Sequence, residues 1–239
     1  MNINQDTWMQ LEELGATFPD YHPTFDFEGD FIDAAHRYLA ECLVKDEILV
    51  QVRNRFRFNS PIRGFLRRAD ALKLYELAYF AQGDILELGT YQGLSTCILS
   101  QANRNSFYRK RIISVDLSAL RLFQTLVNLQ TMGLRRDVKL IRADAAAAIR
   151  RLAHDRRQFA FVFVDHSHAY EPVYAVCSEL RTIVRSGGFC LFHDFNDPRN
   201  KEVQNQDYQV YTAVIEGLNA SEFEFWGIYG CTALYRAIY

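Results

Sequence analysis

From residue 84 onward, the sequence alternates short runs of β-branched and aromatic residues with segments of helical spacing. The runs predict strands at residues 84–88, 111–115, 138–142, 159–164 and 188–192. Helices are expected to begin near Gly93, Ser118, Ala145 and His168. This alternation is typical of an α/β fold in which helices cover both faces of a parallel sheet. We therefore expect a doubly wound, mostly parallel sheet with strand order 3-2-1-4-5.

The C-terminal segment departs from this pattern. After residue 203 comes one more helix, followed by two strand-like runs, 223–228 and 231–237, that meet at Tyr229-Gly230. Two strands joined by a tight turn form an antiparallel hairpin. We expect this hairpin to extend the sheet beside the fifth strand.

Residues 1–60 also differ from the rest of the chain, because residues 1–50 carry eleven acidic side chains against Arg37 and Lys45. They contain only one clear helical stretch, 31–44. We expect an N-terminal arm or cap over residues 1–60 and a single domain over 61–239. An amphipathic helix at 67–82 should lead into the first strand, with a buried side formed by Leu72, Leu74, Leu77 and Ala78.

Composition excludes several classes of protein. Of the 239 residues, 49% are hydrophobic and 23% are charged, which is ordinary for a globular domain. The net charge of −2 makes bulk nucleic-acid binding unfavourable. Arginines interleaved with Phe56, Phe58 and Phe65 form either a solvated face or a surface that binds an anionic substrate or RNA. Five dispersed cysteines indicate reduced core thiols. With neither a signal peptide nor an apolar run of about 18 residues, we expect a cytoplasmic protein without membrane spans.

The first strand runs into the sequence LELGTYQGLST, in which Gly89 and Gly93 frame a strand-to-helix turn. Such a turn presents free amide groups at a helix N-terminus and can bind a carboxylate or phosphate, with hydroxyls added by Ser95 and Thr96. Tyr91 stands where the dinucleotide fingerprint has its second glycine, so a pyrophosphate would fit poorly. A nicotinamide-dependent oxidoreductase is therefore disfavoured.

Asp116 ends the second strand, in IISVDLS. A carboxylate at this position can accept hydrogen bonds from both ribose hydroxyls of an adenosine. A strand-end Asp alone often only caps a helix. An anion-binding turn followed one βα unit later by such an acid, however, is typical of an adenosine cofactor site.

The stretch RGFLRRADALKLYELAYFAQGDILELGTYQGLST resembles the opening of class I, Rossmann-like S-adenosylmethionine-dependent methyltransferases. The similar group includes macrocin O-methyltransferase and cephalosporin hydroxylase-type proteins, and the resemblance extends from about residue 63 to 194. It implies that the methionine end of the cofactor contacts Glu87, Gly89, Thr90, Tyr91, Gly93, Ser95 and Thr96. It also assigns Asp116, with the adjacent Leu117, to the ribose, Asp144 and Ala145 to the adenine, and Asp165 to the cofactor site.

The fourth and fifth strands run into FVDHSHAYEPV and FCLFHDFND. Their carboxyl ends should meet at one crevice, bringing together Asp165, His166, His168, His193, Asp194 and Asn196. We expect His168, His193 and Asp194 to be catalytic, with His168 or His193 removing the proton of the methyl acceptor. A capping or core histidine is the structural alternative for His168.

A divalent cation such as Mg²⁺ is a further expectation at this edge, held weakly by Asp165 and Asp194. In the similar group the fourth-strand pattern reads Asp-Gly-Asp-His-Ser-Tyr-Glu, and Asp165, His168, Tyr170 and Glu171 match it. Ser167 replaces the second Asp of that pattern. Catechol-type methyltransferases carry an Asp-Asn pair at the fifth strand, where this chain has His193-Asp194, so one oxygen ligand is lost.

The leading prediction is an S-adenosylmethionine-dependent O-methyltransferase that acts on a small-molecule hydroxyl, on a sugar or a natural product. The alternatives are a hydroxylase-like relative, an RNA methyltransferase that uses the arginine-rich stretch, and a non-catalytic S-adenosylmethionine-binding protein. A homo-oligomer is compatible with the sequence.

Overall fold

The computed structural model describes residues 43–44, 47–48, 50–53, 59–106, 108–202, 205 and 207–239. Two short antiparallel pairs come first: β1 (Leu43–Val44) with β2 (Glu47–Ile48), and β3 (Val50–Arg53) with β4 (Asn59–Ile62). Most of the expected arm, residues 1–60, lies outside the described residues. So does the expected helix at 31–44, apart from Leu43–Val44, which form a strand instead.

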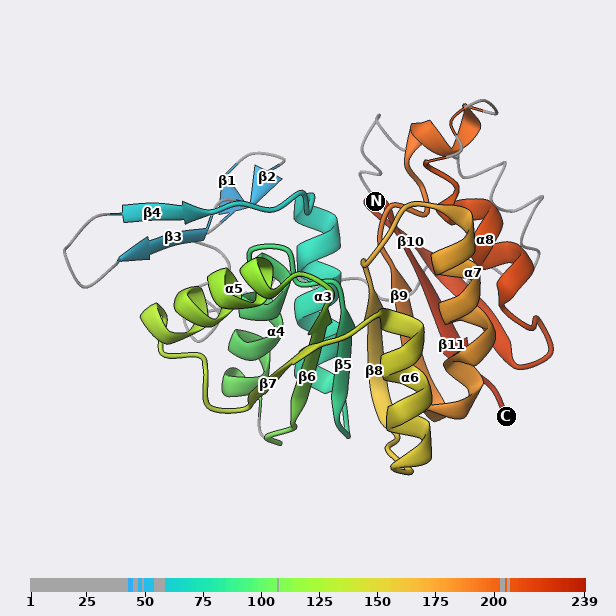
Figure 1. Ribbon diagram of the computed structural model, residues 1–239, viewed down its shortest axis with the longest axis horizontal. Helices are drawn as coiled ribbons and strands as arrows, with labels where there is room; N and C mark the ends of the chain where they lie inside the picture. The colour runs from blue at the N-terminus through green and yellow to red at the C-terminus, as the bar shows by residue number, and fades with distance from the viewer. Residues whose placement is uncertain are drawn as a thin grey trace.

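One seven-stranded sheet organises the rest of the described chain (Figure 1). Its strands are β5 (Ile85–Leu88), β6 (Ile112–Asp116), β7 (Val138–Arg142), β8 (Phe159–Val164), β9 (Val184–Phe192), β10 (Phe223–Tyr229) and β11 (Thr232–Ala237). They lie in the order β10-β11-β9-β8-β5-β6-β7. The first five strands of this sheet in chain order pair in parallel, and β11 pairs antiparallel with β9. The predicted order and the position of the hairpin are confirmed.

The fifth strand is longer than predicted. It begins at Val184, four residues before Gly188, and its pairing with β8 shifts register between Phe159 and Phe161. Gly187 has a φ of 71° inside this strand. Glycine accommodates an irregularity within a strand, so the strand continues through Ser186-Gly187-Gly188.

Helices cover both faces of the sheet (Figure 1). One face carries α3 (Arg68–Phe80), α4 (Leu94–Asn105) and α5 (Ala119–Thr131), and the other carries α6 (Ala145–His154), α7 (Tyr170–Glu179) and α8 (Val210–Gly217). Alternate residues of a strand supply the two cores, so that in β8 Phe161 and Phe163 face the α3 side while Val162 and Val164 face the α6 side. Two short 3-10 turns, η3 (Leu180–Thr182) and η4 (Pro198–Lys201), complete the elements in the described part of the chain.

Helix α3 confirms the predicted amphipathic segment. Leu74, Leu77 and Ala78 are buried, and Leu72 is partly buried against the same core. The backbone N–H of Arg67 donates to Asp70 Oδ2 at 2.8 Å and so caps the first turn. At the other end, Lys110 Nζ donates to the carbonyl oxygens of Ala78 and Tyr79.

The cysteines within the described residues, Cys97, Cys177, Cys190 and Cys231, are buried and form no disulfide with one another, as expected. Cys42 lies outside those residues. None of the helices that the structure describes combines the length and the apolar character needed to cross a membrane.

Candidate active site

Two glycines shape the turn between β5 and α4. Gly89 has a φ of 95° and Gly93 a φ of 88°, a left-handed conformation that side chains disfavour. A Cβ atom at Gly89 would lie 2.1 Å from the carbonyl oxygen of Asp165, and one at Gly93 would lie 2.8 Å from Thr125 Cγ2. The close packing of the turn against β8 and α5 therefore requires glycine at both positions, whether or not a ligand binds there.

Asp116 is bound directly to this turn. Its Oδ2 accepts hydrogen bonds from the backbone N–H and the hydroxyl of Thr90, at 3.0 and 3.1 Å, and from the backbone N–H of Tyr91 at 3.2 Å. Its Oδ1 accepts from the backbone N–H of Ser118 at 2.8 Å. The carboxylate remains partly exposed at the carboxyl edge of the sheet, next to Leu117, which is 69% exposed.

Glu87 lies fully buried near the end of β5. Its Oε2 accepts a 2.7 Å hydrogen bond from the hydroxyl of Thr96, while its Oε1 has no hydrogen-bond partner among the described residues. Burial raises the pKa of Glu87 to about 7, although the nearby hydroxyls of Ser114, Ser95 and Thr96 oppose that effect. The hydroxyl of Thr96, expected to face a ligand, donates to Glu87 instead, and Ser95 beside it is also buried.

The remaining residues expected at the adenine end lie after β7. Asp144 is the N-cap of α6 and its Oδ1 accepts from the backbone N–H of Ala147 at 3.0 Å, while Ala145 is buried. The backbone N–H of Ala143 donates to the carbonyl oxygen of Asp116 at 3.2 Å. The loops after β6 and β7 are thus adjacent, as a shared adenosine pocket would require.

Three of the residues expected at the fourth and fifth strand ends do converge. Asp165, His168 and Asp194 each offer an atom within 4.8 Å of the others. The contact between His168 Nε2 and Asp194 Oδ2 is 2.9 Å, with the histidine side chain 48% exposed and the Asp194 side chain 9% exposed. Asp194 has a φ of 60°, a left-handed conformation that is uncommon for a residue with a side chain. Burial alone would raise the pKa of Asp194, but His193 and His168 together hold it below its usual range.

His193 lies behind this group, buried, with carboxylates on both sides. Its Nδ1 is 3.1 Å from Asp165 Oδ1 and 3.1 Å from Asp194 Oδ2, and its Nε2 is 3.8 Å from Asp70 Oδ2. Burial would lower the pKa of His193, but Asp165, Cys231 and Asp194 raise it well above its usual range. Of the two candidate bases, only His168 has a ring open to an acceptor.

Two other residues expected at this edge are turned elsewhere. His166 Nε2 is 3.2 Å from the carbonyl oxygen of Pro172. Asn196 is fully buried and its backbone N–H donates to the carbonyl oxygen of Cys231. Tyr170 and Glu171, which match the family pattern, start α7, and the Tyr170 hydroxyl donates to Glu216 at 2.6 Å.

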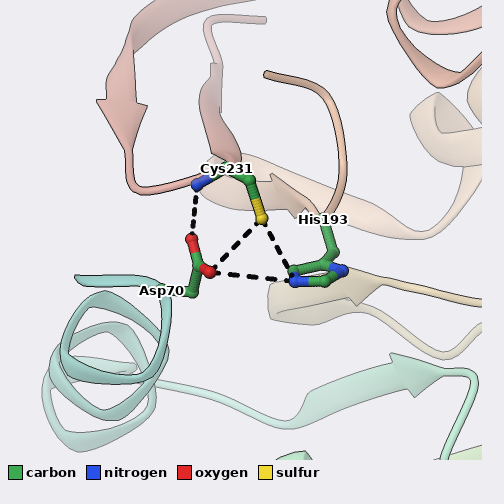
Figure 2. A group of neighbouring side chains, drawn as sticks. All are labelled: Asp70, His193 and Cys231. Carbon is green, nitrogen blue, oxygen red and sulfur yellow. Dashed lines mark hydrogen bonds and ion pairs between the residues drawn. The ribbon is translucent and has the colours of Figure 1, made fainter. Parts of the chain in front are cut away.

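Sequence reasoning missed three residues at this edge. Asp70 and Cys231 lie against His193 (Figure 2), and the ring of Tyr208 lies 4.7 Å from the ring of His168. Arg199 holds Tyr208 through a 2.8 Å hydrogen bond to its hydroxyl. The sequence indicated only a core thiol at Cys231 and gave no signal at Asp70, which lies 161 positions away. Tyr208 does not follow a predicted strand and belongs to no recognised motif, so no sequence signal indicated it.

Comparison with known proteins places this geometry in context. A family model described as a methyltransferase domain matches residues 86–195. No curated protein matches the chain significantly. The fold is similar to that of the O-methyltransferase TomG from Streptomyces achromogenes, involved in tomaymycin synthesis and solved with SAM, at 18% identity and a TM-score of 0.60 over 73% of this chain and 82% of that one.

Two further solved structures are similar at comparable levels. Cofactor-bound Rv0187 from MTB shares 18% identity at a TM-score of 0.60, over 96% of this chain and 98% of that one. An O-methyltransferase from Bacillus cereus in complex with SAH shares 17% identity at a TM-score of 0.56, over 70% of this chain and 78% of that one. Together with the strand order and the glycine turn, these matches show that the chain has the class I, Rossmann-like methyltransferase fold, and that residues 86–195 are similar to a methyltransferase domain.

Proposed function

We propose that the protein is an S-adenosylmethionine-dependent O-methyltransferase that methylates a hydroxyl group of a small molecule, such as a sugar or a natural product. The observation that carries this proposal is the half-exposed His168 bound to Asp194 at the same sheet edge as the glycine turn and Asp116. Methyl transfer to a hydroxyl needs a cofactor pocket beside a proton acceptor. Both elements lie at the carboxyl ends of neighbouring strands.

The residues of the turn fit the cofactor. Glu87 Oε1 is a buried acceptor without a partner among the described residues, which suits the ammonium group of the methionine end. Asp116 keeps a partly exposed carboxylate for the ribose, and Leu117 offers an apolar side chain beside it. When bound, S-adenosylmethionine supplies a methyl group on an already activated sulfonium, so the protein has to align the acceptor and remove its proton.

His168 is the residue that we assign as the base. Its Nε2 faces Asp194 Oδ2 at 2.9 Å, so the Nε2 proton is donated to that carboxylate and Nδ1 is left to accept the proton of the acceptor hydroxyl. Asp194 fixes the tautomer and stabilises the imidazolium that forms, and contact with the tilted ring of Tyr208 holds the imidazole in place. His193 is a positioning residue, because it holds Asp165 and Asp194 together from behind.

We also propose that a divalent cation binds weakly at this edge. Asp165, His168 and Asp194 offer a suitable set of ligand atoms, but Asp165 Oδ1 and Asp194 Oδ2 both already contact His193 Nδ1. A cation would compete with that imidazole for the same oxygens. We therefore expect a chelator to lower the turnover rate only partly, whereas a strictly magnesium-dependent enzyme would lose its turnover.

Domain organisation and location belong to the same proposal. We propose that residues 61–239 form the methyltransferase domain and that residues 1–60 form an arm. The arm either closes over the acceptor or forms a contact within a homo-oligomer. A cytoplasmic location and an acceptor that is not a nucleic acid complete it. An RNA methyltransferase would instead show methylation of RNA that falls with rising salt.

The decisive experiment measures S-adenosylhomocysteine affinity by calorimetry. Asp116→Ala removes a charge-assisted acceptor and should weaken binding by about 1.5 to 3 kcal/mol. The control is Asp137→Ala, because Asp137 precedes β7 at the opposite edge of the sheet and pairs with Arg109. Equal affinity of the Asp116 variant and the wild type would remove the basis of the cofactor assignment. Binding without methylation of any acceptor would favour a non-catalytic cofactor-binding protein.

A further inference from the structure

Three potential metal ligands meet between α3, the end of β9 and the turn of the β10–β11 hairpin (Figure 2). Cys231 Sγ lies 3.3 Å from Asp70 Oδ2 and 3.4 Å from His193 Nε2, and that nitrogen is 3.8 Å from Asp70 Oδ2. All three residues are buried, with at most 4% of any of them exposed. This group, Asp70, His193 and Cys231, is called the Asp-His-Cys cluster below.

The separations within the cluster match those around a tetrahedral zinc ion. With Zn–S near 2.3 Å and Zn–N and Zn–O near 2.0 to 2.1 Å, tetrahedral angles separate sulfur from nitrogen or oxygen by about 3.5 Å, and nitrogen from oxygen by about 3.4 Å. The observed distances of 3.4, 3.3 and 3.8 Å depart from these by less than half an ångström. In this structure the Cys231 thiol donates a hydrogen bond to Asp70 Oδ2, and its sulfur is also within hydrogen-bond distance of His193 Nε2. A metal ion would take the place of the thiol proton within this triangle, with only small shifts of the three ligand atoms.

The orientation of His193 is the second observation. Its Nδ1 is 3.1 Å from both Asp165 Oδ1 and Asp194 Oδ2, so that nitrogen carries a proton that is donated to a carboxylate. Metal-ligating histidines are typically held this way, with one ring nitrogen on a carboxylate and the other on the metal. Here the remaining nitrogen, Nε2, is the one that points into the cluster.

The carboxylate of Asp70 is also held in a fixed orientation, with one oxygen facing the other two ligands. The backbone N–H of Cys231 donates to its Oδ1 at 2.8 Å, and that of Arg67 donates to its Oδ2 at 2.8 Å. The hairpin turn is pressed so closely onto this carboxylate that a Cβ atom at Gly230, which has a φ of 64°, would lie 2.3 Å from Oδ1. These bonds fix the carboxylate and leave Oδ2 with one lone pair directed at the thiol.

We propose that the Asp-His-Cys cluster binds a zinc-class transition-metal ion through Asp70 Oδ2, His193 Nε2 and Cys231 Sγ. A thiolate and an imidazole select such a metal over magnesium or calcium. When the metal–sulfur bond forms, the thiol proton leaves to solvent, as does any proton on His193 Nε2. The fourth ligand is a water molecule or Asp194, whose Oδ1 lies 3.9 Å from Sγ.

This site goes beyond the proposed function, since it needs neither cofactor nor acceptor. The ion would join residues 70, 193 and 231, which come from three separate elements of the fold, and so stabilise the packing of α3 against the hairpin. It also lies directly behind Asp165 and Asp194. Neutral His193 would then hold these two carboxylates as part of the metal site.

Cobalt(II) is the probe that tests the proposal, because a thiolate ligand gives it a sulfur-to-metal charge-transfer band and tetrahedral geometry gives it intense visible bands. The full-length protein should bind about one cobalt ion per chain with both features, and zinc should remove them. Cys231→Ser should lose the charge-transfer band. Cys97→Ser, a buried cysteine outside the cluster, and Cys42→Ser, in the part outside the described residues, should keep it.

A second measurement on the wild type guards against a variant that fails to fold. X-ray absorption at the zinc edge should show one sulfur ligand with the remainder nitrogen or oxygen, and zinc should raise the melting temperature of the wild type but not of Cys231→Ser. A charge-transfer band that persists in Cys231→Ser, or a zinc spectrum without sulfur, would overturn the proposal. Binding to Asp165, His168 and Asp194 alone would give the latter result, because that set contains no sulfur.

Discussion

Glu87 is the buried carboxyl group whose ionisation can be tested most directly. It lies fully buried in β5, between Ser114 of β6 and Phe163 of β8 in register, and its pKa is raised to about 7 by burial, against an ordinary value of 4.5. Because the folded-state pKa is higher than the unfolded one, the folded state binds the proton more tightly. The contribution of Glu87 to stability is thus fully present below about pH 4.5 and is lost as the pH rises to about 7.

The size of the effect follows from the shift. The difference between 4.5 and about 7 is about 2.5 pKa units, and at 1.36 kcal/mol per unit the ionised group lowers the free energy of unfolding by about 3 kcal/mol above pH 7. Glu87→Gln removes the ionisation and keeps the shape and an acceptor for the Thr96 hydroxyl. The amide also introduces a buried N–H group, whose desolvation adds an amount that does not vary with pH.

The observable is therefore the pH dependence of the difference between the variant and the wild type. Urea unfolding between pH 5 and pH 8.5 should show the variant gaining stability relative to the wild type as pH rises, by about 2 to 3 kcal/mol over the range. The matched control is Glu171→Gln, at an exposed glutamate in the first turn of α7. A difference that stays constant across this range would refute the argument that burial controls the ionisation of Glu87.

Two further predictions concern the turn and the base. Asp194→Asn should keep the cofactor affinity, since Asn tolerates the φ of 60° at this position. It should lower turnover about 10²- to 10⁴-fold, because the variant loses the charge that orients His168. Wild-type turnover in the variant would show that these residues are structural. Gly89→Ala should reduce the free energy of unfolding by more than about 3 kcal/mol, because its Cβ would meet the Asp165 carbonyl. The control is Gly133→Ala, because Gly133 also has a positive φ, 68°, but no atom lies within 4 Å of the added Cβ. Its free energy of unfolding should fall by only about 1 kcal/mol in the same denaturation assay. Equal losses in the two variants would show that backbone conformation, and not packing, requires glycine at position 89.

The architecture could be predicted from the sequence because local patterns carry it. Runs such as 159–164 have a length and composition typical of a buried strand, and the right-handed crossover rule then leaves few ways of ordering five parallel strands. The same rule places Gly89 and Asp116 at one edge, since both follow the carboxyl end of a strand. What failed locally was the start of β9, where Gly187 allowed the strand to continue through a sequence that is also typical of a turn.

Only the tertiary structure decided which groups at that edge are exposed. His168 and His193 are equivalent candidates by sequence, yet one is half-exposed on Asp194 and the other is enclosed by carboxylates. Periodicity places a residue at a strand end, but whether its side chain reaches solvent depends on what packs over it. That packing comes from α3 and the C-terminal hairpin.

The sequence by itself therefore determined the sheet, the glycine turn and the acid after the second strand, because each depends on residues within one βα unit. The contact between Asp70 and Cys231 was decided by tertiary structure alone, since these residues are 161 positions apart and join only when α3 packs against the β10–β11 turn. No local pattern encodes that meeting. Burial of apolar surface on both elements brings the polar groups together, and the same burial makes their chemistry different from that of an exposed acid and thiol.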